Sequence, residues 1–180
     1  MKQLLLMDSH NYDESLPEIR RTAVRGIASV NGKILFVEDK FGVLKLPGGG
    51  QDEGETDEET LIREVREETG YNVIPESIRP FGSIEEKRLS TREEMIWHQY
   101  NNIYFCEVDP VPGECDYSEA EKAISMHLHP CTIEEAFEII EQILAREGRQ
   151  AWNQREYNTL RLIKEAGGFA SKEERRMKNE

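Results

Sequence analysis

The sequence predicts an α+β fold, in the layered α/β sense, from three observations on its 180 residues. Runs of β-branched and aromatic residues recur between residues 19 and 108 and predict strands. Two Thr-x-x-Glu capping boxes, at Thr56 and Thr132, each precede apolar residues at helical spacing. Asn31-Gly32 separates two strand-like runs and is the strongest hairpin signal in the chain. Strands mixed with two or three helices are typical of this fold class.

The first part of the chain predicts an arm followed by three strands. Residues 1–18 are acidic and polar except for residues 4–7, so we expect a mobile arm whose apolar run can pack on a neighbour. Strands are predicted over residues 19–30, 33–38 and 43–46. Residues 47–50, Pro-Gly-Gly-Gly, follow as a loop whose glycines let carbonyl and N–H groups turn toward a metal or phosphate.

The middle of the chain predicts a helix and then more strands. The helix begins at the capping box of Thr56 and ends at Thr69, because Gly70 is suited to the left-handed residue past a helix end. Further strands are predicted over residues 72–74, 78–86, 96–108 and 123–128, with charged loops over residues 87–94 and 114–122.

Two more helices are predicted near the C-terminus. The first begins at Thr132 and ends at Gly148, and the second spans residues 150–166. The less polar positions of the second are Trp152, Tyr157, Leu160 and Ile163. This side can cover the chain's own core or another subunit, so a homodimer is one hypothesis. The predicted division is an arm at 1–18, a main domain at 19–148, a helical extension at 149–168 and a charged, disordered tail at 169–180.

Charge and cysteine content narrow the possible partners and compartment. A net charge of −13 argues against binding to duplex nucleic acid or anionic membranes, since Lys and Arg supply that attraction. The three cysteines have no Cys-x-x-Cys spacing, which favours a reducing, cytoplasmic location over a disulfide framework. The first residues lack the apolar length of a signal peptide, and no run approaches transmembrane length.

The helix over residues 56–69 gathers three carboxylates on one side. Glu64, Glu67 and Glu68 stand at i, i+3 and i+4, beside an apolar stripe that can be buried. Like charges this close repel one another, so a cation is expected among them. Clustered carboxylate oxygens suit Mg²⁺ or Mn²⁺. The alternative is a solvated acidic face in a chain with 36 Asp and Glu residues.

The stretch from Gly49 to Tyr71 resembles the Nudix box, G-x5-E-x7-R-E-U-x-E-E-x-G-U, in which U is a bulky apolar residue. The residues at its fixed positions are Gly49, Glu55, Arg63, Glu64, Val65, Glu67, Glu68, Gly70 and Tyr71. Tyr71 replaces the usual aliphatic residue, which bears on packing. The resemblance covers roughly residues 19–146 and implies an α/β/α arrangement, a mixed sheet between helices. The last predicted helix lies outside the resemblance and is an extra C-terminal helix.

This resemblance also implies a Mg²⁺-dependent hydrolase, with Mn²⁺ as a possible substitute. It makes Glu64, Glu67 and Glu68 metal ligands, adds the Gly48 carbonyl as a further possible ligand, and makes Arg63 the residue that orients them. The residues expected to support the site are Gly49, Glu55 and Gly70.

The general base is expected in one of two places. In some members of the family a glutamate in a loop before the last strand acts as base or further ligand. Glu119 and Glu121 occupy the comparable loop here, and Glu121 is favoured; Glu64 is the other candidate. The histidines His98, His127 and His129 are interpreted as surface or packing residues.

The predicted reaction is cleavage of the diphosphate linkage of a nucleoside diphosphate derivative or nucleoside triphosphate. Alternatives are a house-cleaning enzyme for damaged nucleotides, a non-catalytic nucleotide-sensing module on the same fold, and an isomerase. The residues that bind substrate stay open. Aromatic residues able to stack on a base, though more often core, are Phe41, Trp97, Tyr100, Tyr104 and Trp152. Arginines able to meet phosphates, or to solubilise an edge strand, are Arg20, Arg21 and Arg25.

Overall fold

The structure is a computed structural model that describes residues 1–148 and 150–167. Its strands are β1 (Gln3–Asp8), β2 (Glu18–Val30), β3 (Lys33–Glu38), β4 (Leu44–Lys45), β5 (Arg79–Leu89), β6 (Ile96–Glu107) and β7 (His127–Cys131). Its helices are α1 (Asp57–Thr69), α2 (Glu119–Ala123), α3 (Ile133–Glu147) and α4 (Ala151–Glu165), with a 3-10 turn at Pro75–Ser77.

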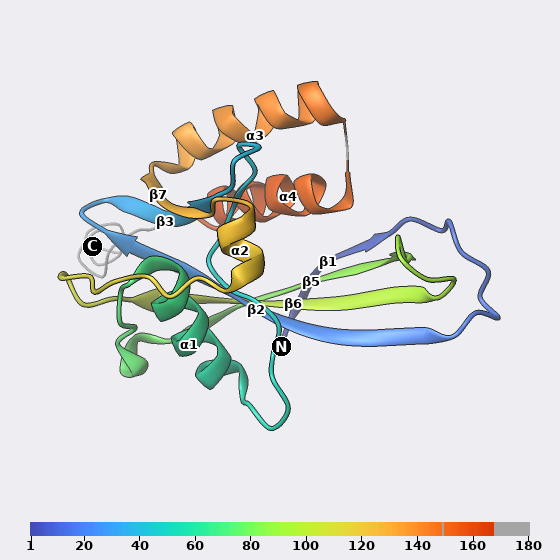
Figure 1. Cartoon of the computed structure of the whole chain (residues 1–180), viewed down its shortest axis with the longest axis horizontal. Coiled ribbons are helices and arrows are strands. Elements are labelled where there is room, and N and C mark those ends of the chain that lie inside the picture. Colours follow the sequence, from blue (N-terminus) through green and yellow to red (C-terminus); the bar gives the residue numbers. More distant parts are fainter. Residues whose placement is uncertain (149, 168–180) are drawn as a thin grey trace.

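The strands of the described residues form one mixed sheet (Figure 1). Along the sheet the order is β1-β5-β6-β2-β3-β4, and β7 also pairs with β3. β2 runs parallel to β6 and β1 runs parallel to β5, whereas the other neighbours are antiparallel. β2 pairs with β3 only at Ser29 and Val30, so among the described strands its first half, where Arg20 and Arg21 lie, has β6 as a partner on one side alone.

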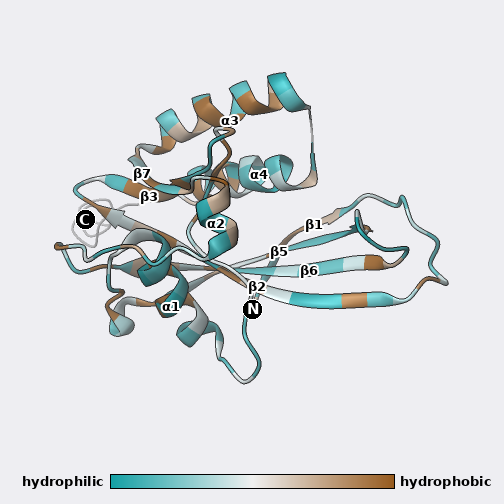
Figure 2. Cartoon of the chain, viewed as in Figure 1, coloured by the Kyte–Doolittle hydropathy of each residue, from teal (hydrophilic) through white to brown (hydrophobic). Residues whose placement is uncertain are grey.

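Helices cover both faces of this sheet, α1 on one side and α3 with α4 on the other (Figure 1). Alternate residues of β2 face the two sides, as the period of a strand requires. Val24 packs in a cluster with Leu61 and Val65 of α1, while Ile27 packs in a cluster with Leu160 of α4. Figure 2 shows apolar and polar residues alternating along α3, so only one side of that helix faces the core. The predicted α/β/α layering is confirmed.

The N-terminal segment is the first difference from the predictions, because part of it is a strand rather than a mobile arm. Gln3–Asp8 forms β1, parallel to β5 at the end of the sheet. The apolar run anchors it: Leu5 and Met7 pack on the larger core cluster. A Cβ at Gly82 would lie only 2.4 Å from the Cγ atom of Leu4. The absence of a side chain at Gly82 therefore makes room for β1.

Three of the strands predicted after α1 also differ from the structure. Residues 72–74 form only an isolated bridge, between Val73 and Val108. β5 continues to Leu89, into the predicted loop, because β6 is long enough to pair with it there. The last strand begins at His127 and not at residue 123, because the acidic segment before it forms α2 with its own capping box.

The C-terminal helix is present as α4. Its less polar side packs on the core of the same chain, which was one of the two alternatives predicted for it. Leu160 and Ile163 are buried in the larger core cluster. Trp152 stands apart from this side and is 41% exposed. The predicted tail at 169–180 lies outside the described residues. Within 1–148 and 150–167, no helix is long and apolar enough to cross a membrane.

Candidate active site

The glycine loop between β4 and α1 is fastened to β2. The Val24 N–H donates to the Gly49 carbonyl over 2.9 Å, and the Gly26 N–H donates to the Pro47 carbonyl over 2.9 Å. Gly48 has φ +140°, and a Cβ there would lie 2.0 Å from the Val24 carbonyl oxygen. Only glycine fits this close approach of two backbones, so the loop holds a fixed position beside the sheet.

Helix α1 is fixed at both ends as its sequence predicts. Thr56 is its N-cap with a complete capping box, and Gly70 ends it in the left-handed conformation. Its first residue, Asp57, accepts hydrogen bonds from Asn102 Nδ2 over 2.8 Å and from the Tyr104 hydroxyl over 2.7 Å. These contacts to β6 set the rotation of the helix, and therefore the direction of its carboxylates.

Arg63 lies among the acidic residues of the box. Its Nε and Nη2 atoms bond the two oxygens of Glu55, each over 2.7 Å, in a bidentate pair. Its Nη1 atom donates to Glu64 Oε1 over 2.7 Å and to Glu67 Oε2 over 3.4 Å. Hydrogen bonding to Arg63 lowers the pKa of Glu55 to about 2. The guanidinium thus neutralises part of the clustered negative charge, at Glu55, Glu64 and Glu67.

Two of the three predicted metal ligands are removed from water. Glu68 is 3% exposed and Glu64 is 8% exposed. Burial raises the pKa of Glu68 to about 7, although the Gly48 N–H donates to its Oε2 over 2.6 Å. Burial also raises the pKa of Glu64. Glu67 differs, with a side chain that is 40% exposed. Without a cation nearby, burying these carboxylates in charged form is unfavourable.

Arg25 is a site residue whose position the sequence did not reveal. It extends from β2 below the loop and donates from Nη1 to the carbonyl oxygens of Leu46, over 3.2 Å, and Gly48. The Gly48 carbonyl, a predicted metal ligand, therefore already has a cationic partner. The sequence gives no signal for this contact, because Arg25 reaches the loop only once the sheet has placed β2 beside it.

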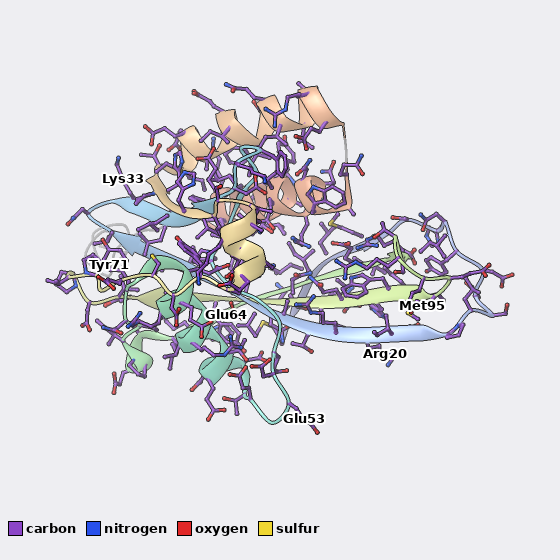
Figure 3. All side chains as sticks on the ribbon, viewed as in Figure 1. Arg20, Lys33, Glu53, Glu64, Tyr71 and Met95 are labelled. Atoms are coloured by element: carbon purple, nitrogen blue, oxygen red, sulfur yellow. The ribbon has the colours of Figure 1, made fainter. Side chains whose placement is uncertain are left out.

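A cavity of about 420 Å³ opens beside the box. Its lining residues are Arg21, Gly49, Gly50, Gln51, Asp52, Arg63, Glu64, Glu67, Ser118 and Glu121. Figure 3 shows Glu64 near the middle of the molecule, where α1 meets the sheet, and Glu53 at the tip of the loop before α1. Of the arginines on β2, Arg21 reaches this cavity, whereas Arg20 pairs with Glu18 over 2.6 Å.

Glu121 reaches the cavity from α2, across from the box. Its carboxylate is the capping group of that helix and accepts from the Ser118 N–H over 2.7 Å and from the Ser118 hydroxyl over 2.8 Å. Glu119, the other glutamate considered in this loop, pairs with Lys122 instead. The structure thus brings Glu121 to the site. Its hydrogen bonds to Ser118 stabilise the start of α2 and do not in themselves indicate a catalytic role.

The aromatic candidates are not gathered in this cavity. Tyr104 bonds Asp57, and Tyr100 stacks on His98 with ring centroids 4.5 Å apart. Trp97 lies under Arg21, whose guanidinium carbon is 5.9 Å from the ring centroid. Phe41 is exposed, so no base-stacking platform is defined by these residues.

The donor set of the box fits a hard divalent cation. Each carboxylate, of Glu64, Glu67 and Glu68, uses one oxygen for the bonds above, and no donor in the described part of the chain bonds the other oxygen. The ligand atoms do not yet converge, however. Among described residues, the group of three whose ligand atoms lie within 4.8 Å of one another is found elsewhere. Arg63 holds Glu64 and Glu67 toward itself, so binding would require the partly exposed Glu67 to rotate.

Comparison with known proteins gives the family. A model of the NUDIX domain matches residues 19–146, most of the chain, so this chain belongs to the NUDIX domain family. The predicted membership of the Nudix family is therefore confirmed.

Individual relatives share part of the chain. The putative 8-oxo-dGTP diphosphatase YtkD of Bacillus subtilis (strain 168) is 31% identical over 104 residues, 58% of this chain and 61% of that protein. The nucleoside triphosphatase NudI of Enterobacter sp. (strain 638) is 36% identical over 91 residues, 47% of this chain and 64% of that protein. The matches thus span less than two thirds of either relative.

Solved structures share the fold. A crystal structure of an ADP compounds hydrolase has a TM-score of 0.54 and 20% identity, covering 81% of this chain and 72% of that chain. At this identity the likeness supports the fold alone.

Proposed function

We propose that this protein is a Mg²⁺-dependent hydrolase that cleaves the diphosphate linkage of a nucleoside triphosphate or of a nucleoside diphosphate derivative. The observation that carries this proposal is the complete Nudix box, whose Glu64 and Glu67 line one cavity together with Arg21 and Arg63. Carboxylates for a cation and arginines for phosphates are the two groups that hydrolysis of a polyphosphate needs.

The residues proposed to hold the cation are Glu64, Glu67, Glu68 and the Gly48 carbonyl, with Mn²⁺ as a substitute for Mg²⁺. When bound, the cation would neutralise charge on the phosphates and lower the pKa of an attacking water. Two buried carboxylates with raised pKa values support this assignment, because a cation would relieve the unfavourable burial of their charge.

Each remaining residue of the site has a proposed role. Arg63 orients Glu55, Glu64 and Glu67 through its guanidinium. Arg21, which has no carboxylate partner among the described residues, is the group most available to a substrate phosphate. For the base that accepts the proton of water, Glu121 and Glu64 both stay candidates, since each accepts hydrogen bonds through one carboxylate oxygen, from Ser118 and from Arg63 respectively.

Similarity to proteins named as an 8-oxo-dGTP diphosphatase and a nucleoside triphosphatase supports a nucleoside triphosphate substrate. Nucleoside diphosphate derivatives stay in the proposal because they contain the same diphosphate linkage. The test is to incubate the purified protein with nucleoside triphosphates including oxidised ones, nucleotide sugars, ADP-ribose and dinucleoside polyphosphates, each with Mg²⁺ or EDTA. Release of phosphate-terminated fragments with Mg²⁺ alone is expected. No turnover of any compound in this panel would contradict the proposal.

A cytoplasmic location and a homodimer also stay proposals. Free cysteines at Cys106, Cys115 and Cys131 support a reducing compartment. The strands β1, β5, β6 and β2 extend beyond the helices in Figure 1, and Leu6 and Ile19 are exposed there, which supports pairing of two copies along this part of the sheet. Light scattering that gives a monomer at micromolar concentration would exclude the dimer.

A further inference from the structure

Outside the box, two histidines and a glutamate meet where β3 and β7 pair. Glu38 is the last residue of β3 and stands opposite His127, the first residue of β7. His129 lies two positions further along, so both rings are on the same side of the strand. Glu38 Oε2 lies 2.6 Å from His129 Nδ1 and 3.4 Å from His127 Nε2. Each of the three residues offers one ligand atom that lies within 4.8 Å of those of the other two.

The backbone fixes which nitrogen His127 presents. Its Nδ1 atom lies 3.2 Å from the carbonyl oxygen of Ser125, which can only accept a hydrogen bond. Neutral His127 therefore carries its proton on Nδ1 and directs the lone pair of Nε2 at Glu38. A carbonyl bonded to the second nitrogen is the arrangement that orients metal-binding histidines. The lone pair and the carboxylate oxygen, 3.4 Å apart, repel each other until a metal ion or a proton on Nε2 is bound there.

We propose that Glu38, His127 and His129 form a second metal site, for a Zn²⁺-class transition metal. Imidazole nitrogens with one carboxylate suit Zn²⁺, whereas the all-oxygen set of the box suits Mg²⁺. Ligand bonds of about 2.0–2.1 Å in a tetrahedron place ligand atoms roughly 3.3 Å apart. The pair of His127 and Glu38 already has this spacing, and the pair of His129 and Glu38 must open by less than an ångström.

The site is accessible and leaves room for water as a further ligand. The His127 side chain is 57% exposed, and His129 lines an open cavity of about 330 Å³. His98 shows that a histidine between carboxylates is not enough. Its Nδ1 lies 3.0 Å from Glu18 and its Nε2 lies 3.3 Å from Glu85. The two carboxylates contact different nitrogens of the ring, so they do not meet at one position where a metal could bind all three residues.

The test is calorimetric titration of Zn²⁺ into the full chain held in saturating Mg²⁺, with histidine ring resonances followed by NMR. We expect one Zn²⁺ per chain, with perturbation of the His127 and His129 rings and not of His10 or His98. Glu67→Gln should bind Zn²⁺ with the same affinity and stoichiometry as the wild type. This result would show that the Zn²⁺ is not bound by the carboxylates of the box. His127→Gln should weaken binding by more than the roughly 10- to 100-fold that loss of an outer-shell partner costs.

His98→Gln is the matched control and should bind Zn²⁺ as the wild type does. His127 is on the surface, so its variant is expected to fold; Glu38→Gln, which keeps the size of the side chain, is the second variant and should weaken binding similarly. The proposal would be overturned if folded His127→Gln and Glu38→Gln bound Zn²⁺ with wild-type affinity. It would also be overturned if Glu67→Gln lost all Zn²⁺ binding, because the binding would then belong to the box.

Discussion

At Gly49, the absence of a side chain is what lets the Glu64 carboxylate reach the loop. A Cβ at this position would lie 2.3 Å from Glu64 Oε1. Since that oxygen is the end of a flexible side chain, Gly49→Ala should fold normally but displace the carboxylate. A displacement near 1 Å can cost on the order of 100-fold in rate. We expect a loss of that size in kcat/KM, with a nearly unchanged melting temperature.

Gly113→Ala is the control, because a Cβ at Gly113 meets no atom closer than 3.6 Å and the residue has ordinary φ. Its rate should equal that of the wild type. If Gly49→Ala were as active as Gly113→Ala, the position of the Glu64 carboxylate would not matter for catalysis.

Glu68 predicts a pH dependence of stability in the metal-free protein. Its pKa rises from an ordinary 4.5 to about 7 on folding. Between these values the folded state holds a proton that the unfolded state has released, so the free energy of unfolding falls as pH rises through this window. Glu68→Gln cannot ionise and keeps an acceptor for the Gly48 N–H. In EDTA it should therefore gain stability relative to wild type as pH rises from about 5 to about 8.

Urea unfolding at several pH values measures this difference. The two proteins should converge below about pH 4.5, where Glu68 is protonated in both states. A stability difference that is the same at every pH would contradict the raised pKa.

At the scale of elements, α4 is held to the sheet by a buried ion pair as well as by apolar packing. Arg155 Nη1 lies 3.1 Å from Glu86 Oε2 of β5, and its Nη2 lies 3.0 Å from Glu156 Oε1. All three side chains are buried or nearly so. Arg155→Ala leaves the buried Glu156 carboxylate without its arginine, whereas Glu86 keeps Arg88 at 2.7 Å, so the variant should lower the free energy of unfolding by about 3 kcal/mol.

Arg161→Ala removes an arginine from the same helix and serves as the control. Arg161 pairs with Glu165 at i+4 on the exposed side, a contact worth about 0.3–0.5 kcal/mol. Equal losses for the two variants in urea unfolding would contradict the buried role of Arg155.

Elements with local signals were predicted well, and elements that depend on distant partners were not. The ends of α1 and α3 follow from capping boxes and glycines that act within a few residues. β1 has no such signal, since Leu4 is seated by Gly82, 78 positions away in the chain. α2 has a capping box at Ser118, but its few residues carry no apolar spacing to make it stand out.

At the scale of the whole molecule, the site also contains some residues whose positions follow from local sequence and others whose positions depend on distant partners. Arg63 with its glutamates was predictable because all lie within one helix and its preceding loop. The positions of Arg21 and Arg25 beside the box follow from β2 crossing under the glycine loop, which is a property of the sheet. The contacts of His127 with Glu38 likewise depend on the register of β7 against β3, 89 positions apart in sequence.

The central claim, that the carboxylates of α1 hold a catalytic cation, is tested most directly by the rate of hydrolysis of Glu67→Gln at saturating Mg²⁺. Glutamine keeps the size and helix propensity of the side chain but removes the charge that a hard cation requires. The partly exposed Glu67 should be replaceable without loss of fold. If the cation supplies several kcal/mol of transition-state stabilisation, the rate should fall on the order of 1,000-fold, at about tenfold per 1.36 kcal/mol.

Glu58→Gln gives the comparison, because Glu58 is exposed on the same helix and outside the fixed positions of the box. It should hydrolyse the substrate at the wild-type rate, with circular dichroism confirming that both variants are folded. A rate for Glu67→Gln equal to that of wild type and Glu58→Gln would contradict the metal site, and would leave the acidic side of α1 as a solvated surface on a nucleotide-sensing Nudix fold.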